Sequence, residues 1–134
     1  FQRCIVPANS WFEWSEPKKP YLIKNKKNKI ISFAGLYKIE KNDEKKFIII
    51  TSEANGSLRK IHNRTPVVVK QKNFMNWLGE DYKSALSILK PINNNDYDFH
   101  PVSPEIGKVS NDSKDILKVY QNKKNDIPLF PNLF

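Results

Sequence analysis

The first half of the chain alternates short apolar runs with polar turns, which is the pattern of antiparallel strands. Because strands joined by short turns usually pair with their neighbours, a meander of hairpins is expected. The last of these runs, "FIIIT", is almost wholly apolar and is predicted to be a buried strand. Gly35 is predicted to mark a bulge or a point of close approach. The predicted strands cover residues 11–14, 21–24, 30–39 and 47–51.

Helical spacing begins in the second half. A short helix is predicted over residues 52–62, with either Ser52 or Glu53 as its N-cap. Leu58 and Ile61, three residues apart, form its inner face. The stretch "NRTP" ends it, because the residue before a proline avoids helical dihedral angles.

The remaining pattern completes an α+β domain with a mostly antiparallel sheet or partial barrel and peripheral helices. Phe74, Trp77 and Leu78 are spaced to share one face of the next helix, which Gly79 closes. The apolar but proline-broken tail is expected to pack as an arm. The predicted elements are a buried strand at 66–70, helices at 71–79 and 81–90, a strand at 97–103 and the tail at 126–134.

Length and composition favour one globular domain. The 134 residues, 39% of them hydrophobic, are enough to bury a core. No apolar run approaches the roughly 20 residues that span a bilayer, and no signal-peptide pattern opens the chain, so no membrane partner is expected. A single cysteine, Cys4, excludes an internal disulfide and agrees with a reducing compartment, which predicts a cytoplasmic location.

The cysteine and the histidines do not predict a metal site. Cys4, His62 and His100 lack metal-ligand spacing, and four scattered glycines form no phosphate loop, so neither metal nor cofactor is expected. Cys4 is interpreted as a small buried hydrophobe on a strand, and His100 as a structural residue. The net charge of +9 suggests a polyanionic partner, although most of the excess is lysine, which also suits a solvated surface.

The stretch "WFEW" places a carboxylate among aromatic rings. Alternation along a strand puts Trp11 and Glu13 on one face, with Phe12 and Trp14 on the other. A carboxyl beside aromatic rings loses hydration, which raises its pKa toward the range where it transfers protons near neutral pH. The alternative is a strand glutamate that faces solvent.

The stretch "IHNRTP" places His62 and Arg64 at a helix-to-strand junction, where catalytic groups often lie. A neutral imidazole can donate or accept a proton, and a guanidinium can hold a phosphate. The alternatives are a histidine that caps a helix and an arginine that pairs with Glu13 or Glu53.

Six segments occur in a fixed order: "RCIVPANSWFEW", "FAGLY", "FIIITSEAN", "IHNRTPVVV", "NWL" and "VSPEIGKVSND". Together they resemble the SOS response-associated peptidase (SRAP) family of abasic site processing proteins, over almost the whole chain. The resemblance implies a bacterial, nucleoid-associated monomer of the DNA damage response. It also implies an SRAP-type barrel-like core with a positively charged groove for single-stranded DNA.

The resemblance further implies covalent chemistry at abasic sites. In the family, the α-amine of an N-terminal cysteine condenses with the sugar aldehyde, and the thiol closes a thiazolidine ring. Glu13 matches the active-site glutamate that shuttles protons, and His62 matches the histidine that assists opening of the sugar ring. The positions that match DNA contacts or line the same pocket are Trp14, Arg64, Thr51 and Asn55.

The family's nucleophile does not align with Cys4, and three positions depart from the family pattern: Tyr37, Thr65 and Gly107. Residues 1–134 are therefore expected to be the C-terminal portion of a single SRAP domain, without its N-terminal strands and unable to crosslink alone. Two other functions remain open. One is a self-processing peptidase, and the other is a non-catalytic module that only binds single-stranded DNA.

Overall fold

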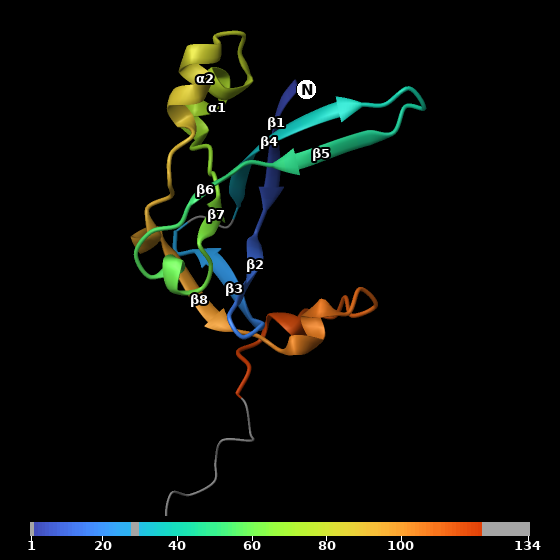
Figure 1. The fold of residues 1–134 in the computed structure, drawn as a ribbon, viewed down its shortest axis with the longest axis vertical. Helices are drawn as coiled ribbons and strands as arrows, with labels where there is room; N and C mark the ends of the chain where they lie inside the picture. Colours follow the sequence, from blue (N-terminus) through green and yellow to red (C-terminus); the bar gives the residue numbers. More distant parts are fainter. Residues whose placement is uncertain (1, 28–29, 122–134) are drawn as a thin grey trace, which may run out of the picture.

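The computed structural model describes residues 2–27 and 30–121, which form three antiparallel sheets and two short helices (Figure 1). The α+β class is confirmed, and the described residues form no closed barrel. One sheet has the order β1 (Gln2–Ala8), β4 (Ile31–Ile39), β5 (Lys45–Ile49); the second has the order β2 (Ser10–Ser15), β3 (Lys19–Asn25), β8 (Tyr97–Pro101); the third pairs β6 (Thr51–Glu53) with β7 (Arg64–Pro66).

The predicted meander is correct for two hairpins, β2–β3 and β4–β5, and wrong for the pairing of β3 with β4 between them. Strands β2 and β3 pair with Glu13 opposite Tyr21, as expected. Strand β4, however, pairs with β1 rather than with β3, and β8 takes the place beside β3. In the β1–β4 register Cys4 lies opposite Gly35, where an added Cβ would stand 2.8 Å from the Cys4 sulfur. Gly35 is therefore a point of close approach, as predicted.

The apolar stretch at residues 47–51 is not one buried strand. All five residues of β5 are exposed, because β5 is the outer edge of its sheet and the β4–β5 hairpin extends away from the rest of the molecule (Figure 1). β5 ends at Ile49 and β6 begins at Thr51. The N–H of Ile50, between them, donates to the Ala34 carbonyl. Neither helix in the described ranges has the length and apolar character that a bilayer span requires.

The helix predicted at residues 52–62 shrinks to a single 3₁₀ turn, η1 (Leu58–Lys60). Ser52 and Glu53 belong to β6 and cap nothing, because pairing with β7 holds them in a strand. Gly56, with a φ of +51°, turns the chain between the two elements. Leu58 and Ile61 are buried, so the predicted inner face is confirmed.

The next two helices form, but both are shorter than predicted. Trp77 is buried, whereas its neighbour Leu78 is 49% exposed, so the predicted shared face is wrong for Leu78. Successive helical residues point about 100° apart, and the short helix cannot bury both. The elements are η2 (Gln71–Asn73), α1 (Phe74–Leu78) and α2 (Tyr82–Ile88).

Short turns complete the described chain. His100 is structural, as predicted: its Nε2 contacts the Leu117 carbonyl at 2.9 Å.

In the stretch predicted as a strand at residues 66–70, β7 ends at Pro66, and Val67 and Val69 continue as buried extended chain that bonds to the β4 backbone. The tail at residues 126–134 lies outside the described residues. The remaining 3₁₀ turns are η3 (Asn94–Asp96), η4 (Pro104–Gly107) and η5 (Lys114–Leu117).

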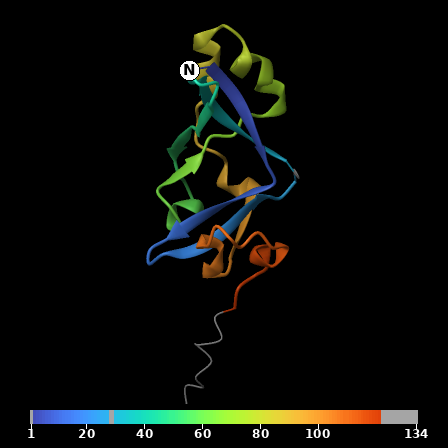
Figure 2. The ribbon, with the colours of Figure 1, turned by 90° about the vertical axis from the view of Figure 1, so that its right-hand side faces the viewer.

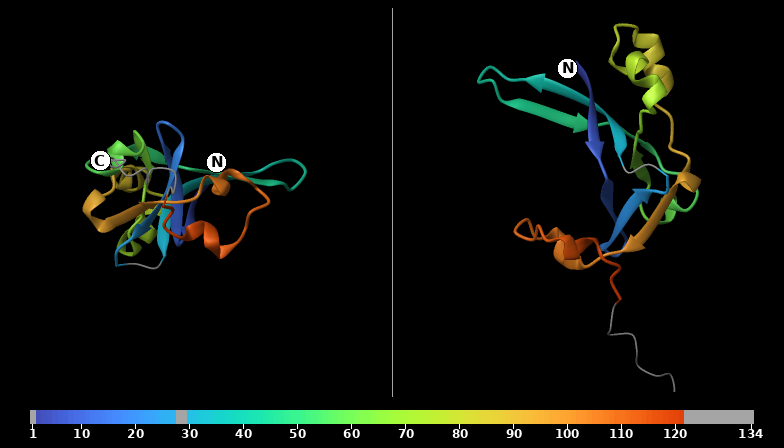
Figure 3. Two further views of the ribbon diagram at one scale, coloured as in Figure 1. Left: turned by 90° about the horizontal axis from the view of Figure 1, so that it is seen from below. Right: turned by 180° about the vertical axis from the view of Figure 1, so that it is seen from behind.

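The apolar core has two parts. The helices lie at one end of the molecule and the η4 and η5 turns at the other, as Figure 2 and the right-hand view of Figure 3 show; the left-hand view of Figure 3 looks along the line that joins the two ends. The helix cluster contains Ala34, Val67, Val69, Trp77 and Ala85. The sheet cluster contains Trp11, Ile23, Ile31, Phe33, Leu58, Ile61, Ile92 and Tyr97, and it underlies the strand that carries Glu13.

Candidate functional site

Strand β2 places Glu13 beside the sheet cluster. Alternation puts it on the same face as Trp11, whose ring packs edge to face against Phe33 and Tyr97 at centroid distances of 5.7 and 5.4 Å. The Glu13 side chain is only 19% exposed. Burial raises the pKa of the Glu13 carboxyl, which confirms the direction expected from the sequence.

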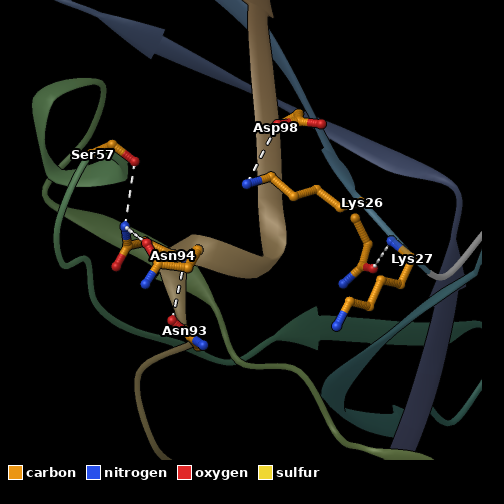
Figure 4. A network of polar contacts seen from close by, with 8 residues as sticks. Lys26, Lys27, Ser57, Asn93, Asn94 and Asp98 are labelled. Atoms are coloured by element: carbon orange, nitrogen blue, oxygen red, sulfur yellow. Dashed lines mark hydrogen bonds and ion pairs between the residues drawn. The ribbon is translucent and has the colours of Figure 1, made fainter.

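A folded loop brings His62 to the same place. Asn94 packs against Gly56 and its Nδ2 contacts the Ser57 hydroxyl at 3.5 Å (Figure 4). The side-chain amide of Asn55 donates to the Ile92 carbonyl at 3.0 Å. These contacts fix the loop that leads into η1, and η1 ends next to His62.

Glu13 and His62 meet although they lie far apart in the sequence. The distance from Glu13 Oε2 to His62 Nδ1 is 3.7 Å. Attraction to the imidazole lowers the pKa of Glu13, but the burial effect is larger and the net shift is upward. The pair therefore combines a carboxyl that accepts a proton easily with an imidazole that can exchange one.

The Nδ1 atom of His62 also contacts the Arg64 backbone. It lies 3.0 Å from the Arg64 carbonyl and 3.3 Å from the Arg64 N–H, so its role depends on the tautomer. A protonated Nδ1 donates to the carbonyl, and a bare Nδ1 accepts from the N–H. The ring thus contacts the strand that follows it and does not cap the carbonyls of η1.

Strand pairing orients Arg64. Its Nε donates to the Thr51 hydroxyl at 2.8 Å and its second terminal nitrogen to the Thr51 carbonyl at 2.6 Å. The alternative, an ion pair of Arg64 with Glu13 or Glu53, does not form, and Glu53 lies 3.7 Å from Arg59 instead. The Arg64 guanidinium is exposed and held in one orientation, an arrangement suited to an anionic ligand.

The other sequence-predicted residues are placed differently. Trp14 is 44% exposed and lies on the opposite face of β2 from Glu13, so it adds little to the burial of that carboxyl. The side-chain amide of Asn55 donates to the Ile92 carbonyl. Cys4 is half-buried in the β1–β4 sheet, and burial raises the pKa of its thiol, which disfavours the reactive thiolate.

The described residues hold no group of three or more acidic, histidine or cysteine side chains that could bind a metal ion. A hollow of about 330 Å³ lies near Lys18, Val102 and Tyr120. Another of about 270 Å³ lies near Cys4 and Phe47. Neither of these two hollows is lined by Glu13 or His62.

The buried carboxyl predicts a pH-dependent stability. Because the pKa of Glu13 is raised on folding, the folded state binds more protons, and stability falls as pH rises past the unfolded value of about 4.3. We expect Glu13→Gln to increase the free energy of unfolding at pH 7 and to change it less at pH 3. Urea denaturation at both pH values measures this. A gain that grows on acidification would contradict it.

Comparison with known proteins identifies the same family that the six sequence segments resemble. The family model described as "SOS response associated peptidase (SRAP)" matches residues 1–109. "Abasic site processing protein YoqW" of Bacillus subtilis is 33% identical over 128 residues, covering 87% of this chain and 57% of that protein. "Abasic site processing protein YoaM" of the same organism is 32% identical over 127 residues, covering 87% and 56%.

A solved structure shares the fold. The crystal structure of a Bacteroides thetaiotaomicron protein superposes with a TM-score of 0.78 at 28% identity, covering 90% of this chain and 57% of that one. The chain thus spans between half and two thirds of the length of these three relatives.

Proposed function

Because this chain belongs to the SOS response-associated peptidase (SRAP) family, we propose that it supplies the proton-transfer residues and part of the DNA-binding surface of a protein that processes abasic sites in single-stranded DNA. The curated relatives that carry this domain are named abasic site processing proteins. The covalent nucleophile is the N-terminal cysteine of the family, which is not Cys4.

The 3.7 Å contact between Glu13 and His62 carries the proposal. An abasic sugar reacts as an aldehyde only after its ring opens, which requires one proton to leave the hydroxyl at C1 and another to reach the ring oxygen. Condensation with an amine then expels water, which also requires a proton donor. Burial raises the pKa of Glu13 and favours its protonated form, which suits the carboxyl to donate and recover a proton. His62 assists ring opening.

The DNA contact is assigned to Arg64 on β7 and Trp14 on β2. A guanidinium suits a phosphate, and an exposed indole suits stacking with a base or sugar, the usual combination for single strands. Thr51 supports this role by holding the guanidinium. Asn55 contributes through the loop that positions His62.

Substitution of Arg64 tests the phosphate contact. We expect Arg64→Ala to weaken binding to single-stranded DNA and to reduce the slope of log K against log salt by about 0.7, the value of one lost phosphate contact. The measurement is fluorescence anisotropy across a salt series. Arg59→Ala is the matched control, because Arg59 lies near Glu53 instead of Thr51. Equal effects from both substitutions would remove Arg64 from the site.

An abasic oligonucleotide tests the function itself. When it is incubated with the whole SRAP protein, we expect a heat-stable shifted band, and replacement of the N-terminal cysteine by alanine should abolish the band but not the binding. Binding without any crosslink in the unsubstituted protein would instead indicate a DNA-binding module. Multiple turnovers on a peptide substrate would instead indicate a peptidase.

A further inference from the structure

The indole N–H of Trp11 is unusual because it is buried and makes no hydrogen bond. Trp11 is 9% exposed, and its Nε1 is one of three buried polar side-chain atoms in the described residues that lack a partner. Buried polar groups are nearly always paired, so an unpaired one calls for a structural or functional reason. Packing against Phe33 and Tyr97 explains why the ring is buried, but it does not explain why the N–H has no partner.

The Glu13 carboxylate is a nearby acceptor for this N–H. The two residues share one face of β2, two positions apart. Trp11 lowers the pKa of Glu13, the effect of a donor beside a carboxylate, although the N–H stands outside good hydrogen-bond geometry. Two titratable side chains lie beside Glu13. His62 contacts its carboxyl, and Tyr21 lies opposite it on β3.

We propose that Trp11 is the positioning residue of the site: its indole N–H holds the Glu13 carboxylate, directly or through one water molecule, so that Oε2 stays turned toward His62. This role rests on the proposed function for its purpose, but the contact itself can be tested without DNA. The rigid packing of the indole between Phe33 and Tyr97 makes it a fixed donor, whereas the carboxyl can rotate. A fixed donor selects one rotamer of the acid when it is ionised.

Trp11→Phe separates the donor from the packing. Loss of the donor removes a hydrogen bond to the charged form and should raise the pKa of Glu13 by about one pH unit. Loss of ring volume alone would admit water and lower it. The two explanations therefore predict opposite signs. The measurement is a carbon-13 NMR titration of the Glu13 side chain in the chain without DNA.

Two further variants make the test decisive. Trp77→Phe is the matched control, because it removes a buried indole whose N–H donates to the Cys4 carbonyl in the other cluster, and it should leave the titration of Glu13 unchanged. If Trp11→Phe does not fold, replacing Trp11 by its benzothiophene analogue keeps the ring shape and removes only the N–H. A fall or no change in the pKa of Glu13 in the Trp11 variant would overturn the proposal.

The result is independent of the proposed function. An upward shift with normal crosslinking rates would confirm the contact and show that catalysis does not need it. An unchanged titration together with slow crosslinking in Glu13→Gln would leave the proposed function intact and remove Trp11 from it.

Discussion

Glu13→Gln in the whole SRAP protein should slow crosslinking to an abasic oligonucleotide by about 10²- to 10⁴-fold, the usual contribution of a positioned proton-transfer group. Glutamine keeps the size of the side chain and can still accept a hydrogen bond, but it can neither carry nor release the proton. Affinity for single-stranded DNA should change less than about threefold, because the phosphate contact is assigned to Arg64. Gel analysis of timed samples gives the rate and anisotropy gives the affinity.

The matched control is Glu53→Gln on β6. It removes the same charge from an exposed glutamate that lies near Arg59, so it should leave the rate almost unchanged. His62→Ala should produce a milder defect than Glu13→Gln, since the imidazole assists and the carboxyl transfers the proton. Parallel losses of rate and affinity in Glu13→Gln would count against the proton-shuttle role.

The largest expected effect on stability is that of Trp77→Ala, which should lower the free energy of unfolding by about 3–5 kcal/mol. Trp77 is 2% exposed and joins α1 to the sheet in two ways. Its N–H donates to the Cys4 carbonyl at 2.8 Å, and its own carbonyl accepts from Arg3 Nε at 2.6 Å. The substitution would therefore leave a cavity and remove the indole bond to β1, while the backbone carbonyl at position 77 would still accept from Arg3.

Leu78→Ala is the control for this prediction. Leu78 follows Trp77 on the same helix but is exposed, so its removal should cost less than about 1 kcal/mol. Urea denaturation compares the two variants. Similar losses would mean that α1 is not held by Trp77. Because Glu13 belongs to the other part of the core, the titration of its carboxyl should be the same in both variants.

Local features were predictable from the sequence. Alternation along residues 11–14 predicted that Trp11 and Glu13 share a face, and the aromatic surroundings predicted the upward shift in the pKa of Glu13. The spacing of Leu58 and Ile61 predicted that both are buried. These features depend on neighbouring residues of one element, which is the information that sequence periodicity contains.

Long-range pairing was not predictable in the same way. Periodicity does not state which strand lies beside which, so the pairing of β4 with β1 and the exposure of β5 were missed. Pairing of β6 with β7 also placed Ser52 and Glu53, the first two residues of an expected helix, in a strand, because tertiary contacts override local propensity. The bonds from Arg64 to Thr51 follow from this pairing and had no local signal beyond the polar residues themselves.

The pH dependence of crosslinking is the most direct test of the central claim that Glu13 transfers protons at the abasic sugar. In the unsubstituted protein, one limb of the pH–rate profile should follow an apparent pKa above that of an ordinary glutamate, and this limb should disappear in Glu13→Gln. The remaining slow reaction should then titrate only with other groups. A profile of unchanged shape in Glu13→Gln would contradict the account.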